Sequence, residues 1–175
     1  MIKHFFLSII LCIIFTISLA QDKVLLKHDA QIVKLTGHLA EKSNEILDYI
    51  RQAQNAGTLE DTRLFIDLAL LEGENFSATV QYLINELLDI HNYADKNKWI
   101  DMESAAGKVE DKYYDMKLMA DDIIYALQDA SRFSALTDMH MKLSLARSKM
   151  EDAMNASNEA ELLLIDFRKT AGLNQ

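Results

Sequence analysis

The sequence predicts an all-α fold, an antiparallel bundle of four long helices with up-down-up-down topology. In four separate stretches of about 35 residues, apolar residues recur at spacings of three and four, the pattern of a helix that buries one narrow face. The chain has no proline, a residue that breaks helix interiors, and only a few residues separate one stretch from the next. Helices of equal length joined by short turns must each run back beside the previous one. The same stripes would also suit two long hairpins that pair between chains, which is the alternative assembly.

The first twenty residues have the pattern of a secretory signal peptide. Lys3 gives a basic start, residues 5–17 are an apolar run, and small residues precede a cleavage point after Ala20. The apolar run is shorter than the roughly 20 residues that span a bilayer, so we expect cleavage rather than a retained membrane anchor. We therefore expect residues 1–20 to be the signal peptide and residues 21–175 to be the bundle domain. The mature protein would be exported, to the periplasm in a bacterium or otherwise secreted, without stable membrane insertion.

Cysteine usage and charge restrict the chemistry of the mature protein. Cleavage would remove Cys12, the only cysteine, and leave neither disulfides nor thiol chemistry in an oxidising compartment. The whole chain has a formal net charge of −9 with histidine neutral. So acidic a chain is a poor candidate for binding nucleic acid or an anionic membrane, and would more readily attract a cation or a basic partner.

The first helix of the bundle is expected over residues 22–56, and Gly57 stands where a helix terminator belongs. Its stripe contains two consecutive steps of four, a stutter that locally unwinds a supercoil. The stripe comprises Leu25, His28, Ile32, Leu35, Leu39, Ser43, Ile46, Ile50 and Ala53.

The second helix is expected to begin at Thr58, because Asp61 follows three residues later and the pair resembles a capping box. Its stripe comprises Ile66, Ala69, Gly73, Phe76, Val80, Leu83, Leu87, Ile90 and Ala94. Residues 64–71 are apolar at every position except Asp67, which is a wider face than a contact between two helices needs. Either this face is buried among several neighbours or it contacts another chain. The candidate partner-binding residues are Leu64, Phe65, Leu68 and Leu71.

The third and fourth helices are expected over residues 99–132 and 136–171, and a polar turn at residues 95–98 precedes the third. The stripe of the third helix comprises Met102, Ala106, Val109, Tyr113, Met116, Ala120, Ile123, Leu127 and Ala130. The stripe of the fourth helix comprises Leu136, Met139, Leu143, Ala146, Met150, Ala153, Ser157, Ala160, Leu164, Phe167 and Ala171. All methionines after Met1 fall on these two helices, where they either fill the core or line an adaptable groove.

Standard metal motifs are absent from the sequence. The chain contains no Glu-x-x-His of the di-iron bundles, no His-Glu-x-x-His and no Asp-rich calcium loop. A weaker alternative is a loosely held cation at one end of the bundle. Counting residues outward from the turns places His91 at the same height along the bundle as Glu103 and Asp166. These three residues are the candidate metal ligands.

Haem could bind only non-covalently, because the chain has no Cys-x-x-Cys-His. The same count places His28 level with Glu86, and His91 about one turn beyond, at the end of the bundle that carries Met102. His28, His91 and Met102 are therefore the candidate ligands of a haem or the lining of a small apolar site. The alternative is that His28 is a core histidine and His91 a surface residue.

Catalytic machinery is not expected. The sequence has no Gly-x-Ser-x-Gly, and its stripes contain no paired carboxylates for acid–base chemistry. The second helix, residues 58–95, carries eight acidic residues against Arg63 as its single basic one. That imbalance indicates either an acidic face for a basic partner or a solvated face that keeps the protein soluble.

These observations together predict an exported, non-enzymatic bundle that acts by binding. The first hypothesis is a protein-interaction module that uses the acidic and apolar surface of the second and third helices. Its partner would be a basic protein or a second copy of the chain. The second hypothesis, from a different class, is a carrier of haem or a small apolar ligand between the helices; otherwise we expect no cofactor.

Overall fold

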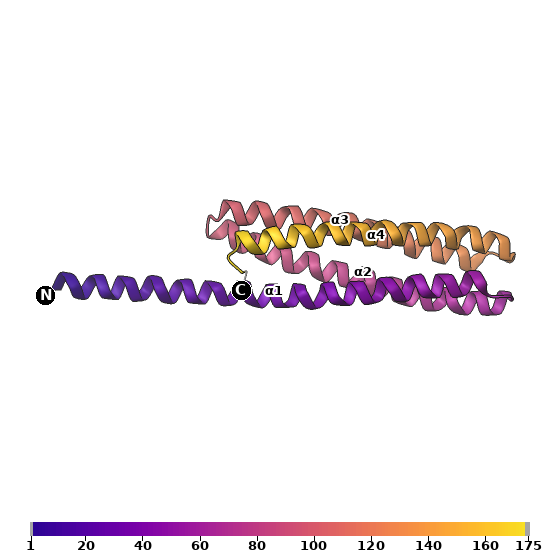
Figure 1. The fold of residues 1–175 in the computed structure, drawn as a ribbon, viewed down its shortest axis with the longest axis horizontal. Helices are drawn as coiled ribbons and strands as arrows, with labels where there is room; N and C mark the ends of the chain where they lie inside the picture. The colour runs from indigo at the N-terminus through magenta and orange to yellow at the C-terminus, as the bar shows by residue number, and fades with distance from the viewer. Residues whose placement is uncertain (1, 174–175) are drawn as a thin grey trace.

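The computed structural model describes residues 2–173, with side chains from residue 23 onward. Over that range the chain forms four α-helices and no β-strand: α1 (Ile2–Asn55), α2 (Leu59–Lys96), α3 (Ile100–Arg132) and α4 (Leu136–Thr170). Each helix packs along the next one in sequence, and α4 returns to contact α1 (Figure 1). The predicted antiparallel four-helix bundle is confirmed.

The start of α1 differs from the expectation. The helix begins at Ile2 rather than near residue 22, and its first part projects past the ends of the other three helices (Figure 1). No glycine or proline precedes Gly37, so nothing in the backbone interrupts the helix there. The side chains of the expected signal peptide lie outside the described residues. From residue 23 onward, where side chains are described, no helix is long and apolar enough to cross a membrane.

The turns are short and carry specific caps. The Thr58 hydroxyl accepts a hydrogen bond from the Asp61 backbone N–H at 3.1 Å and donates to the Asp61 carboxylate at 2.8 Å, which confirms the predicted cap of α2. In the turn between α2 and α3, the rings of Tyr93 and Trp99 meet edge to face, with centroids 5.6 Å apart. Gly172 ends the fourth helix with a positive φ of 71°, the left-handed conformation that glycine adopts most easily.

The predicted stripes form the core of the bundle. Every stripe residue is buried except His28, Leu136, Ser157 and Ala171, which are partly exposed. Leu136 and Ala171 lie at the two ends of the fourth helix, where fewer neighbouring residues cover them. The buried face is wider than the stripes because each helix packs against two neighbours. Its additional buried apolar residues are Ile84, Ala126 and Ala156.

The methionines act mainly as core filler. Met102, Met116, Met139 and Met150 are buried, and Met119 and Met154 pack against the core from its edge. Only Met141 is largely exposed among those described. The described methionines therefore belong mainly to the core rather than to a surface groove.

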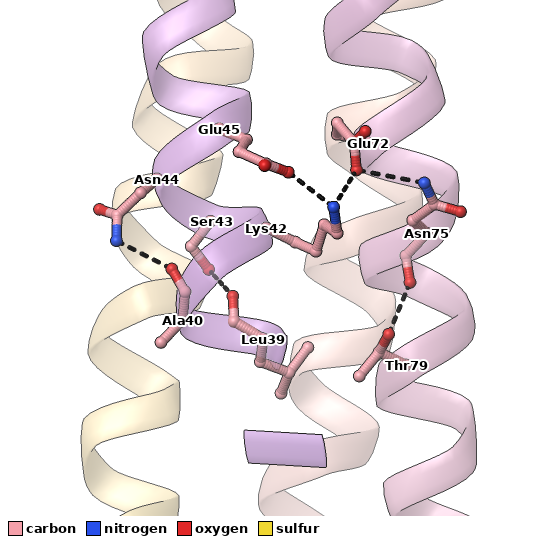
Figure 2. A network of polar contacts seen from close by, with 9 residues as sticks. All are labelled: Leu39, Ala40, Lys42, Ser43, Asn44, Glu45, Glu72, Asn75 and Thr79. Atoms are coloured by element: carbon pink, nitrogen blue, oxygen red, sulfur yellow. Dashed lines mark hydrogen bonds and ion pairs between the residues drawn. The ribbon is translucent and has the colours of Figure 1, made fainter. Parts of the chain in front are cut away.

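Ion pairs on the flanks of the stripes join neighbouring helices and set their register. Figure 2 shows Lys42 of α1 between Glu45 of the same helix and Glu72 of α2, with Nζ–Oε2 distances of 2.7 and 2.9 Å. These hydrogen bonds raise the pKa of Lys42 above its usual value. Three lysines join α3 to α4 in the same way. Their pairs are Lys112–Glu159, Lys142–Asp129 and Lys149–Asp122.

Candidate functional site

His28 lies between α1 and α2. Its Nδ1 is 2.6 Å from Oε2 of Glu86, and its side chain is mostly buried. The prediction that His28 and Glu86 lie at the same height along the bundle is therefore confirmed. The contact makes His28 part of the α1–α2 interface rather than an open ligand position.

His91 lies between α2 and α3. Its Nδ1 is 3.2 Å from Oε2 of Glu110, and its Nε2 is 3.7 Å from Oε1 of Glu103. Gly107 of α3 lies beside the imidazole, where a Cβ would make ordinary van der Waals contact at 3.7 Å from Cε1 of His91. Glu110 is nearly buried, so its contact with His91 satisfies a carboxylate that would otherwise be costly to bury.

The candidate haem ligands occupy separate surroundings. His28 is engaged across the α1–α2 interface, His91 across the α2–α3 interface, and the Met102 side chain is buried in the core. Each imidazole has a carboxylate partner from a different helix. The fully buried Phe167 is packed within the same core cluster as Met102. This arrangement favours packing over ligand binding.

The candidate metal ligands come together only in part. Glu103 faces His91, whereas Asp166 lines a hollow between α3 and α4 with Asp101 and Lys108. Among the side chains that the structure describes, no group of three or more histidines and carboxylates is arranged to hold a metal ion.

Three of the four candidate partner-binding residues turn away from the core. Leu64 and Leu71 are 55% and 53% exposed, and Leu68 is partly exposed. Phe65 points to the other side of the same segment and packs against the core. The broad apolar face of residues 64–71 thus divides into an inner part and an outer part.

The outer part continues along α2 as a second stripe. Its spacings of four and three alternate without a slip, so it follows one line on the helix surface opposite the buried stripe. We call it the outer α2 stripe: Leu64, Leu68, Leu71, Asn75, Ala78 and Tyr82. Tyr82 is 60% exposed. This second stripe is visible in the sequence, but the stronger buried stripe of the same helix masks it.

Carboxylates follow one edge of the outer α2 stripe. Glu60, Asp67 and Glu74 recur at seven-residue intervals, and all three are exposed. No ion pair reaches any of them from the described residues. Arg63, which lies between Glu60 and Asp67 in the sequence, instead donates a hydrogen bond to the backbone oxygen of Phe133 at 3.3 Å. Glu60, Leu64 and Asp67 also line a shallow hollow at the beginning of the helix.

The opposite edge of the outer α2 stripe is already used by the bundle. Glu72 is bound by Lys42, and Glu86 by His28, both from α1. Among the described side chains, the two edges therefore differ: the carboxylates on the edge toward α3 are unpaired, and Glu72 and Glu86 on the other edge are paired.

The third helix also exposes apolar side chains, but most of its carboxylates are paired. Tyr114, Leu118 and Tyr125 are exposed on its outer face. The carboxylates around them pair with lysines: Asp115 with Lys112, Asp121 with Lys117 and Asp122 with Lys149. Of the surface expected on the second and third helices, α2 combines apolar side chains with a row of three unpaired acids. Among the described acids of α3, Asp101 and Asp111 have no ion pair.

Two buried polar atoms have no hydrogen-bond partner in the described part of the chain, the Tyr113 hydroxyl and Nε2 of His140. Burial raises the pKa of Tyr113, the nearby Glu161 raises it further, and Arg168 lowers it. Sequence periodicity placed Tyr113 in the core but carries no signal for an unsatisfied hydroxyl.

Comparison of the chain with family models, curated proteins and solved structures finds no match.

Proposed function

We propose that the protein is an exported, non-enzymatic protein-interaction module, and that its binding surface is the outer α2 stripe. The observation that carries the proposal is the exposure of Leu64, Leu71 and Tyr82 along one line of α2, opposite the face that the bundle buries. Complete burial of one leucine is worth roughly 1.5–3 kcal/mol. Leu64 and Leu71 are about half exposed, so a partner helix or sheet that covered this line would gain roughly half of that free energy from each.

Other functions have less support. A carrier of haem or an apolar ligand needs a space shared by its ligands, whereas His28 and His91 are engaged at different helix interfaces. Export rests on residues 1–20 of the sequence, and the absence of catalytic motifs favours binding over catalysis.

Site-specific photocrosslinking in the native host tests the proposal. A benzophenone amino acid replaces Leu71, and the adduct is identified by mass spectrometry. Leu162 of α4 is the matched control, because it is a leucine of similar exposure on another face. We expect a discrete adduct from position 71 and none from position 162. Equal adducts from both positions, or none from positions 64, 71 and 82, would overturn the proposal.

A further inference from the structure

We propose that the partner of the outer α2 stripe is a basic amphipathic helix that docks along it as in a two-stranded coiled coil. This inference rests on the proposed function and names the class of partner. The alternating spacings of four and three from Leu64 to Tyr82 are the spacings of coiled-coil core positions. A helical partner presents its own apolar residues at the same spacing, so the two stripes interlock along their whole length.

The length of the stripe sets the length of the partner. From Leu64 to Tyr82 the stripe is about 27 Å long, at about 1.5 Å per residue. A helix of about three heptads covers it. Asn75 lies at a core position of the stripe, where a single polar residue fixes the register of a coiled coil.

The carboxylates beside the outer α2 stripe indicate that the partner helix is basic. Glu60, Asp67 and Glu74 occupy the edge position of successive heptads, where coiled coils form ion pairs between helices. These carboxylates have no cationic partner within the described residues, whereas Asp115, Asp121 and Asp122 beside the exposed apolar residues of α3 each pair with a lysine. A helix with lysine or arginine at seven-residue intervals along one edge would complement all three.

The same charges argue against a second copy of this chain. In an antiparallel pair of α2 helices, the edge with Glu60, Asp67 and Glu74 would face itself. In a parallel pair it would face the edge that holds Glu72 and Glu86. The antiparallel arrangement opposes like charges, which is unfavourable in a coiled coil. The parallel arrangement offers the three carboxylates no free cation, because Lys42 and His28 already pair with the acids of the facing edge.

Fluorescence anisotropy with a synthetic helix tests the inference on the full chain. The probe is a labelled three-heptad peptide with leucine at the core positions and lysine at the edge positions; the control peptide has glutamate in place of lysine. We expect saturable binding of the lysine peptide only. The triple variant E60K/D67K/E74K should weaken that binding by about tenfold or more and favour the glutamate peptide.

A matched triple variant, D95K/D101K/D111K, changes the net charge equally at exposed acids away from the stripe. It should retain the preference for the lysine peptide. Equal loss in both triple variants would mean that net charge alone drives the binding and would overturn the inference. So would a dimer of the protein that L71D dissociates in sedimentation equilibrium, because the occupant would then be a second copy. Failure of the lysine peptide, together with a Leu71 crosslink to another protein, would overturn the basic helix while the proposed function stands.

Discussion

Arg168 of α4 donates a hydrogen bond from Nε to Oδ1 of Asp29 of α1 at 2.6 Å, and both side chains are largely buried. This pair joins the first and last helices, which contact one another much less extensively than sequential neighbours do. It therefore closes the bundle where apolar packing contributes least.

Arg168→Ala should destabilise the protein more than loss of an ordinary surface ion pair. The change leaves the largely buried Asp29 carboxylate without its partner, so we expect a loss of about 1–3 kcal/mol in the free energy of unfolding, measured by urea denaturation. The control is Arg147→Ala, whose exposed pair with Glu151 within α4 should contribute about 0.5 kcal/mol or less. Equal effects of the two substitutions would show that the α1–α4 pair has no special role.

Tyr113→Phe should stabilise the protein. The phenol is fully buried and its hydroxyl has no partner, so removal of the oxygen abolishes a desolvation cost of about 1–3 kcal/mol. Thermal and urea unfolding should both shift upward. A loss of stability would instead mean that the hydroxyl binds a water molecule or a ligand inside the bundle.

The contribution of Glu72 should depend on pH. Burial by itself would raise the pKa of Glu72, but hydrogen bonds from Lys42 and Asn75 outweigh burial and lower the pKa below the usual 4.5. A depressed pKa in the folded state stabilises the fold above the unfolded value and ceases to do so as pH falls through the folded value. Glu72→Gln should therefore destabilise the protein at pH 7, by roughly 1 kcal/mol. The difference should shrink below pH 4.5 in urea titrations, and a constant difference would contradict this account.

The two faces of α2 should respond oppositely to the same substitution. Leu71→Asp places a charge on a half-exposed position, and we expect the helical circular dichroism to survive with a stability change within about 0.5 kcal/mol. Leu87→Asp places it at a fully buried position, where an unpaired charge should abolish cooperative folding. Unfolding caused by Leu71→Asp would mean that the outer α2 stripe is part of the core.

Hemin should not bind specifically through His28 or His91. Because each imidazole is held by a carboxylate, we expect hemin titrations of the wild type, His28→Ala and His91→Ala to give the same visible spectra. A Soret band that His28→Ala removes would restore the carrier hypothesis.

The residues of this chain determine its helices and their inward faces almost completely. Stripe positions such as Ile32, Phe76 and Leu143 are buried as predicted, because the periodicity of burial is a property of the helix itself. Thr58 and Asp61 likewise cap α2 through contacts only three residues apart. The level of His28 with Glu86 follows from the turn position and the constant rise of a helix.

Tertiary structure alone decided which flanking side chains meet. A side chain beside a buried stripe faces one neighbouring helix or the other, depending on the order of the helices around the core and on the rotation of each helix about its axis. The spacing of the stripes does not specify either property. His91 therefore meets Glu110 as well as Glu103, while Asp166 lies in the groove between α3 and α4. The division of residues 64–71 into an inward Phe65 and an outward Leu64 and Leu71 has the same origin. The apolar character of a side chain shows that it can be buried. Whether it is buried in this protein depends on which neighbouring helices pack against it.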